Sequence, residues 1–269
     1  MGMTQLLRAL AIALLALLGA TAARAAEPLP EGHAHNDYEH ARPLLAALEA
    51  GFKSVEADIW LVDGQLKIGH SFSDLRAGRT LQSLYLDPLE ARFDAGTLKP
   101  MILLIDIKSE GESTYAALEQ VLVGYAGMLT RFEAGRLVPG MVTAIISGNR
   151  PRTTMESEQS RLAFYDGRLG DLGSGLSPDF MPLVSDNWTK IFSWTGAGEM
   201  PQGDATRLRE LVAKAHAEGY KLRFWETPDV PGADRDRLWR TLAEAGVDFI
   251  NTDDLIGFAT FRATLARGD

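Results

Sequence analysis

The sequence of 269 residues contains no cysteine. This excludes a disulfide framework, and it also excludes a lipid attached to a cysteine behind a cleaved leader. Basic residues are outnumbered by acids, 27 against 36, which gives a net charge of −9. Nucleic acid is therefore not an expected partner, and an anionic substrate would have to meet a local cation, either a bound metal or a well-placed Lys or Arg.

The sequence has only one long apolar run, from Ala9 to Ala20. Arg8 precedes this run, and the small residues Ala23 and Ala25 follow it. The run is too short for a bilayer, which needs about 20 apolar residues. The pattern is typical of a secretory signal peptide over residues 1–25. It predicts an exported protein, periplasmic or secreted.

Residues 26–269 show no repeat, low-complexity tract or linker, and we expect a single domain. Apolar, β-rich segments alternate with helical patterns or loops, which favours parallel βαβ units. The expected fold class is therefore α/β, a (β/α)8 TIM barrel. The eight expected strands are 32–36, 53–61, 101–107, 141–147, 162–165, 182–185, 221–225 and 247–251.

Four helices are expected, over 43–50, 113–128, 205–218 and 233–245. Gly51, Gly219 and Gly246 follow three of them, where a left-handed C-cap belongs. The stretch 148–194 is rich in Gly, Pro, Ser and Asp, and we expect loops over the barrel mouth there.

Two acids alternate with apolar residues on the expected second strand, Val55-Glu56-Ala57-Asp58-Ile59. Side chains of a strand alternate between its faces, so Glu56 and Asp58 share one face. In a barrel strand the apolar face packs against helices, which leaves the acids pointing inward or at the rim. Charges there need compensation, and a divalent metal would supply it.

The apolar run that begins at Met101 is ended by Asp106, and Lys108 follows two positions later. Because barrel enzymes place their chemistry at strand C-termini, Asp106 is positioned to join Glu56 and Asp58 as a third oxygen ligand. Lys108 could then meet a phosphate oxygen as a point charge.

Histidines are few, and four of the five precede residue 71. His33 and His35 lie on or just past the first strand, and His70 ends a short segment after the acid pair. Imidazoles at strand ends suit general acid and base work near neutral pH. We interpret His40 and His216 as structural.

These residues together resemble a known superfamily. The order His35-Asn36, Glu56-Ala-Asp58, His70-Ser71, Asp106-Ile-Lys108 and Asn251-Thr252-Asp253 is similar to glycerophosphodiester phosphodiesterases, phosphatidylinositol-specific phospholipases C and sphingomyelinase D-like enzymes. The His-Asn-Asp-Tyr phrase and the Glu-x-Asp pair most resemble the altered-inheritance-of-mitochondria protein 6 branch.

The resemblance implies a (β/α)8 barrel that cleaves phosphodiesters, small-molecule or lipid, with transient contact with a membrane surface allowed and no obligate protein partner. It implies one Mg²⁺ or Ca²⁺ on Glu56, Asp58 and Asp106, with His35 and His70 catalytic. The substrate-binding residues would be Asn36, Lys108, Trp225 and Asn251. The Arg-Gly and Glu-Asn-Thr phrases of standard glycerophosphodiesterases are absent, which leaves the head group open.

Two other functions stay open at this stage. His33-x-His35 also resembles the first-strand motif of amidohydrolases, although such sites draw further histidines from later strands. The chain could instead be an exported protein that binds a phosphodiester head group without turnover.

Overall fold

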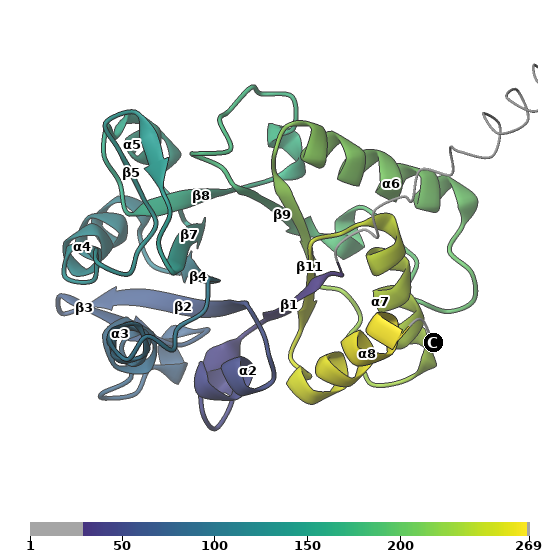
Figure 1. The fold of residues 1–269 in the computed structure, drawn as a ribbon, viewed down its shortest axis with the longest axis horizontal. Helices are drawn as coiled ribbons and strands as arrows, with labels where there is room; N and C mark the ends of the chain where they lie inside the picture. Colours follow the sequence, from purple (N-terminus) through teal and green to yellow (C-terminus); the bar gives the residue numbers. More distant parts are fainter. Residues whose placement is uncertain (1–28, 268–269) are drawn as a thin grey trace, which may run out of the picture.

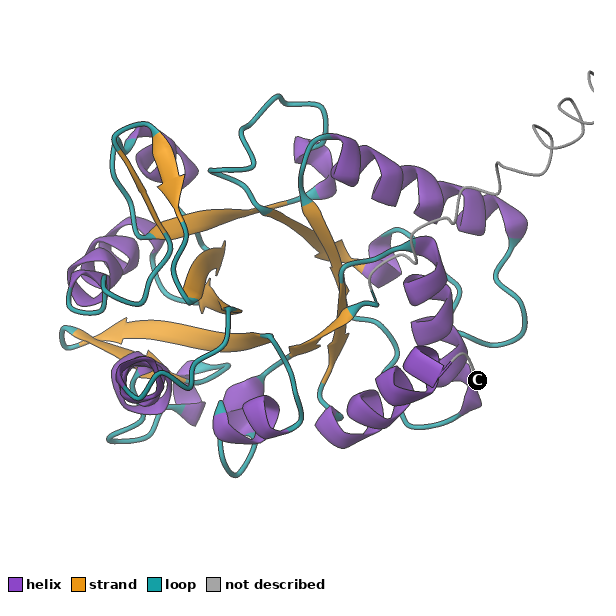
Figure 2. Ribbon diagram, viewed as in Figure 1, coloured by secondary structure: helices purple, strands orange, loops and turns teal. Residues whose placement is uncertain are grey.

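The computed structural model describes residues 29–267, and the expected signal peptide lies outside them. Eight parallel strands form a closed ring with helices outside it (Figures 1 and 2). The first strand, β1, closes the ring because it pairs with the last, β11, and also with β2. The barrel strands are β1 (Glu31–Ala34), β2 (Ser54–Val62), β4 (Met101–Ile107), β7 (Val142–Gly148), β8 (Ala163–Gly167), β9 (Leu183–Asn187), β10 (Lys221–Trp225) and β11 (Phe249–Thr252).

The predicted (β/α)8 class is confirmed, with local departures. One connection, from β8 to β9, has no α-helix and uses the short 3-10 helix η4 (Leu169–Asp171). Three helices had no clear sequence signal, namely α3, α5 and α8. The helices are α2 (Leu45–Glu49), α3 (Asp87–Asp94), α4 (Gly111–Val123), α5 (Arg152–Ser157), α6 (Gln202–Ala217), α7 (Ala233–Ala245) and α8 (Leu255–Arg267).

Helix ends follow local chemistry. The glycines Gly51, Gly219 and Gly246 all have positive φ, as expected for C-caps. The expected helix 113–128 is shifted, since α4 begins at Gly111, where the Glu110 carboxylate accepts hydrogen bonds from two main-chain N–H groups of the first turn. The stretch 148–194 contains α5, β8, β9 and η4, so it is not only loops.

Two hairpins extend the barrel. Strand β3 (Gln65–Ile68) pairs antiparallel with the end of β2 and carries the chain to His70 at the barrel mouth. Strands β5 (Arg131–Glu133) and β6 (Arg136–Val138) form a separate hairpin before β7. Phe132 of this hairpin packs against the inner apolar cluster of the barrel. The hairpin therefore helps to cover the amino end of the barrel.

Alternation along each strand separates two apolar layers. Outward residues such as Val55, Ala57 and Leu103 belong to the large core between strands and helices. Inward residues near the amino ends form a smaller cluster of Leu104, Ile145, Phe164, Leu183 and Phe249. Two positions further along these strands, the inward residues become polar: Asp106, Ser147, Asp166, Ser185 and Asn251. The barrel thus has an apolar floor and a polar layer above it.

None of the helices in the described part of the chain is both long and apolar enough to cross a lipid bilayer.

Candidate metal centre and active site

Three carboxylates meet in the polar layer. Glu56 and Asp58 point inward from β2, and Asp106 points inward from β4, where it is paired in register with Asp58. One oxygen of each lies within 4.8 Å of the others. The atoms Glu56 Oε2, Asp58 Oδ1 and Asp106 Oδ1 are buried and have no hydrogen-bond partner among the described residues. Buried carboxylate oxygens without donors are costly, and this all-oxygen set suits a hard divalent cation.

The second oxygen of Asp58 is surrounded by donors. Asp58 Oδ2 accepts a hydrogen bond from the Tyr38 hydroxyl at 2.8 Å. It also lies 3.0 Å from Lys108 Nζ and 3.1 Å from His70 Nδ1. Burial and the charge of Glu56 nevertheless raise the pKa of Asp58 to about 7. The negative charges in this cluster are therefore only partly compensated by the protein, which a bound cation would relieve.

Lys108 bridges two members of the acidic group. Its Nζ lies 3.2 Å from Asp106 Oδ2 in addition to its contact with Asp58. The expected role, contact with a substrate phosphate, remains a prediction. In the structure the ammonium holds the two Oδ2 atoms and leaves both Oδ1 atoms free of hydrogen bonds.

An arginine and two imidazoles surround Glu56. Its Oε2 lies 3.5 Å from His33 Nε2, 3.8 Å from Arg223 Nη1 and 3.9 Å from His35 Nε2. Burial opposes ionisation, but these neighbours outweigh it and hold the pKa of Glu56 below its usual range. Glu56 is thus an anion at neutral pH, as a metal ligand must be.

The two histidines of the first strand differ in their environments. His33 is buried, its Nδ1 lies 2.7 Å from Ser54 Oγ, and burial together with the charge of Arg223 lowers its pKa to about 4. His35 is more open, and its Nδ1 lies 2.9 Å from Asp253 Oδ1. Burial opposes protonation of His35, but Asp253 and Glu56 outweigh it and raise the pKa. His35 is the better placed of the two for proton transfer.

His70 is the most exposed member of the site, with 61% of its side chain accessible. Its Nδ1 faces Asp58, as the Nδ1 of His35 faces Asp253. An imidazole that donates from Nδ1 to a carboxylate keeps Nε2 for exchange of a proton with a substrate. Both predicted catalytic histidines therefore reach the acidic group from the barrel mouth.

The predicted substrate-binding residues divide into two groups. Asn36 Oδ1 lies 2.7 Å from the Tyr38 hydroxyl oxygen, and Asn251 Oδ1 accepts from Arg223, so both belong to the network around the acids. Trp225 ends β10, is half-buried and makes no hydrogen bond with these residues. The structure brings Asn36 and Asn251 into the hydrogen-bond network of the site, whereas no hydrogen bond among the described residues joins the Trp225 side chain to it.

Sequence reasoning did not assign Tyr38, Arg223 or Asp253 to the site. Arg223 had a signal, because it is a polar residue between Leu222 and Phe224 on an expected barrel strand and must point inward. Asp253 had a weaker one, two positions after Asn251.

A second polar cluster lies on the strands across the barrel. Asp166 accepts hydrogen bonds from Ser147 Oγ and Ser185 Oγ and forms an ion pair with Arg168 at 2.7 Å. Burial disfavours the charged form of Arg168, yet the neighbouring Asp166 carboxylate outweighs this effect and raises the pKa of Arg168. This cluster is internally compensated, in contrast to the acidic group.

Gly148 permits the close approach of Asp106. Its φ is +67°, and a Cβ would lie 2.0 Å from Asp106 Oδ1 and 2.4 Å from the Ile107 carbonyl oxygen. We expect Gly148→Ala to destabilise the fold by about 2–4 kcal/mol, the sum of left-handed strain and overpacking. We also expect it to weaken cation binding. Denaturant unfolding and a cation titration would measure both effects.

The matched control for this change is Gly135→Ala in the β5–β6 turn. Gly135 has φ +75° but nothing within 4 Å of a Cβ. It should cost only the backbone strain, about 1–2 kcal/mol. Equal losses in the two variants would show that the contact with Asp106 is unimportant.

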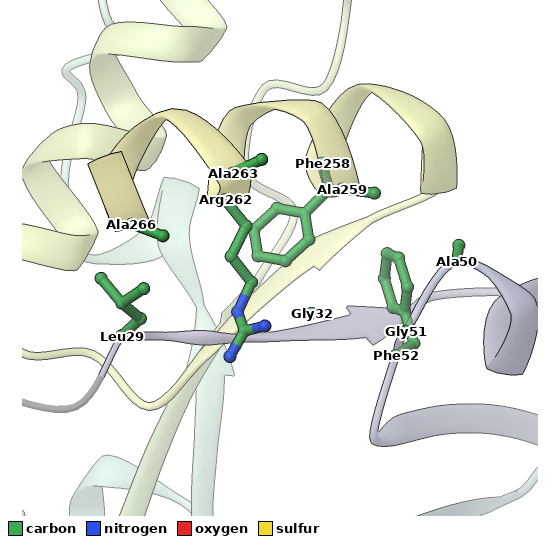
Figure 3. Close-up of a pocket in the computed structure, with 10 residues that line it drawn as sticks. All are labelled: Leu29, Gly32, Ala50, Gly51, Phe52, Phe258, Ala259, Arg262, Ala263 and Ala266. Carbon is green, nitrogen blue, oxygen red and sulfur yellow. The ribbon is translucent and has the colours of Figure 1, made fainter. Parts of the chain in front are cut away.

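The cavity in Figure 3 lies away from these residues, at the amino end of β1, between α8 and the turn that follows α2. It is lined mainly by apolar side chains such as Leu29, Phe52 and Phe258. Arg262, its one charged group, donates to the Pro30 carbonyl and to Glu31. This cavity offers no catalytic group.

Comparison with known proteins identifies relatives of the whole barrel. Residues 22–96 and 90–166 match the family described as AIM6-like phosphodiesterase domain. A relative from Arthroderma benhamiae, an altered inheritance of mitochondria protein 6 homolog, is 32% identical over 85% of this chain and 82% of its own length. The Lachancea thermotolerans protein of that name is 31% identical over 84% of this chain and 64% of its own length.

One solved structure supports the fold. A glycerophosphoryl diester phosphodiesterase from Parabacteroides distasonis superposes with a TM-score of 0.55 and 13% identity, covering 90% of this chain and 88% of that one. The likeness concerns the barrel architecture.

The relatives also correct one expectation. The prediction of an exported, periplasmic or secreted protein is contradicted. The relatives are altered inheritance of mitochondria proteins from fungi, and fungi are eukaryotes. The residues on which that prediction rested lie outside those that the structure describes.

Proposed function

This chain belongs to the AIM6-like phosphodiesterase family, and we propose that it is a metal-dependent phosphodiester hydrolase. The main support is the cluster of Glu56, Asp58 and Asp106, in which each residue has one buried carboxylate oxygen without a hydrogen bond. Two imidazoles, of His35 and His70, contact or approach this set from the mouth. A cation site with two proton-transfer groups is the equipment that cleavage at phosphorus requires.

The metal would be Mg²⁺ or Ca²⁺, held by the three acids. When bound, it would supply positive charge to the phosphate oxygens as negative charge develops there. Arg223 and Lys108 contribute fixed positive charge on either side of the acidic group. They hold the carboxylates in place and keep the site from repelling an anionic ester.

The histidines would divide the proton work. His35 is the better general acid, because its raised pKa keeps the imidazole protonated closer to neutral pH. His70 would then act as the base that activates the nucleophile. The attacking group is a neighbouring hydroxyl where the substrate has one, which yields a cyclic phosphate, and water where it has none.

The amidohydrolase alternative, which His33 and His35 suggested, finds no support in the structure. Within residues 29–267, the close groups of three or more metal-ligating side chains consist of the acidic set alone. His33 is bonded to Ser54, and His216 lies on α6 in an ion pair with Asp248. A zinc site of the amidohydrolase type would need imidazoles that this barrel does not gather.

The proposal is tested with a panel of phosphodiesters, soluble and lipid, after chelation and after return of Mg²⁺, Ca²⁺, Mn²⁺ or Zn²⁺. We expect cleavage to disappear with chelator and to return with Mg²⁺ or Ca²⁺. Cleavage that survives exhaustive chelation, or binding of phosphodiesters without any product, would contradict the proposal.

A further inference from the structure

A second cavity, of about 410 Å³, opens on the other side of His70. It lies between residues 38–41, which follow β1, and residues 68–79, which begin at the last residue of β3. Tyr38 and His70 line it, and both also contact Asp58 of the acidic group. The cavity is therefore adjacent to the proposed reaction centre, separated from it by these two side chains.

Two guanidinium groups in this cavity lack a carboxylate partner. Arg76 donates through Nη1 to the main-chain carbonyls of Ser73 and Leu75, and Arg79 donates through Nη2 to the carbonyl of Tyr38. Within the described residues, neither forms an ion pair. Carbonyl oxygens orient a guanidinium but do not neutralise it, so both retain their charge and spare N–H donors.

Two acids, Glu39 and Asp74, also line the cavity, and neither forms an ion pair with these arginines. Asp74 is occupied locally, because its Oδ2 accepts from the Ser71 N–H at 2.8 Å and from Ser71 Oγ at 2.5 Å. Glu39 is exposed and forms no ion pair with either arginine. His40 adds a further polar atom, since its Nε2 is buried with no hydrogen-bond partner among residues 29–267.

We propose that this cavity is a subsite for an anionic group, a carboxylate or a second phosphate, carried by one arm of the substrate ester. Arg76 and Arg79 bind that group while His70 faces the scissile phosphate. The size is sufficient for a small polar head group. In a chain with a net charge of −9, two arginines that form no ion pair offer a local site at which an anion can bind.

The inference rests on the proposed phosphodiesterase activity for its substrate, but the anion site can be tested without turnover. Inorganic phosphate is titrated calorimetrically into chelator-treated protein. We expect wild-type protein to bind it, Arg76→Gln and Arg79→Gln to bind it about five-fold or more weakly, and Arg76→Lys to recover part of the affinity. Arg209→Gln, on the exposed face of α6, is the matched control and should bind as wild type does.

Absence of phosphate binding in wild type, or unchanged binding in both Arg76→Gln and Arg79→Gln, would overturn the subsite. Arg76 is exposed, so its replacement leaves the fold intact and the result interpretable. This measurement stands even if no phosphodiester is ever cleaved.

A second experiment addresses selectivity during turnover. The serine and ethanolamine esters of glycerophosphate differ by one carboxylate. We expect wild type to favour the serine ester in kcat/KM, and Arg76→Gln to reduce that preference by about three- to ten-fold, the effect of one partly solvated ionic hydrogen bond. The Arg209→Gln control should cleave both esters as wild type does. Equal preference in wild type and variant would refute the subsite while leaving the proposed activity standing.

Discussion

Replacing Asp106 by asparagine is expected to lower turnover by about 10³-fold or more, because metal-based charge stabilisation contributes several kcal/mol to such reactions. Asparagine keeps the volume of the side chain and can still contact Lys108 through its amide oxygen. What it removes is the charge of the buried Oδ1, one of the three oxygens that the proposed cation would bind.

Stability should separate this effect from simple damage. Burial raises the pKa of Asp106, so without a cation the ionised carboxyl destabilises the fold increasingly as pH rises through that pKa. Asp106→Asn should therefore be at least as stable as wild type in the presence of chelator. Wild type should gain about 2.7 kcal/mol when the cation reaches 100 times its Kd, and the variant should gain far less.

The comparison uses thermal unfolding with and without Mg²⁺ or Ca²⁺. Asp248→Asn is the control, because Asp248 pairs with His216 and Lys221 outside the site. It should keep both the cation-dependent rise in Tm and the activity. If the Asp106→Asn protein shows the same cation-dependent rise in Tm as wild type, Asp106 is not a ligand of the cation.

Replacing His70 by alanine is expected to lower kcat by about 10² to 10⁴, the range typical of general acid–base catalysis. His70 is largely exposed and packs against little, so the free energy of unfolding should hardly change. The cation-dependent rise in Tm should also persist, because His70 contacts Asp58 through the oxygen that Tyr38 and Lys108 already hold. Steady-state kinetics and thermal unfolding on the same preparation would measure both.

His35→Ala should show a loss of similar size with a different pH profile. A general acid must be protonated, so wild-type kcat/KM should fall as pH rises through the raised pKa of His35. The variant should lose this alkaline limb. His216→Ala serves as the control for both substitutions and should retain full activity. If the His70→Ala protein remains active, or if His35→Ala keeps the alkaline limb, the assigned roles are wrong.

The strands could be predicted because their signal is local. Strands β4 and β10 have the bounds expected from the sequence, and the helix 233–245 does too. The inward direction of Glu56, Asp58 and Asp106 also follows from alternation along single strands. Helix α8 was missed, because its run Leu255–Arg267 mixes Phe, Ala, Thr and Gly without a clear apolar face, and its burial depends on β1 and α7.

The sequence by itself therefore determined the barrel, the acid-bearing strands and the histidines near them. Only the tertiary structure decided which polar groups meet. Asp253 reaches His35 across 218 residues because closure of the ring joins β11 to β1. The Arg76–Arg79 cavity likewise depends on how the chain after β3 settles against the chain after β1. Periodicity is a property of neighbours along one strand, whereas these distances arise from register and closure between strands that the local pattern does not encode.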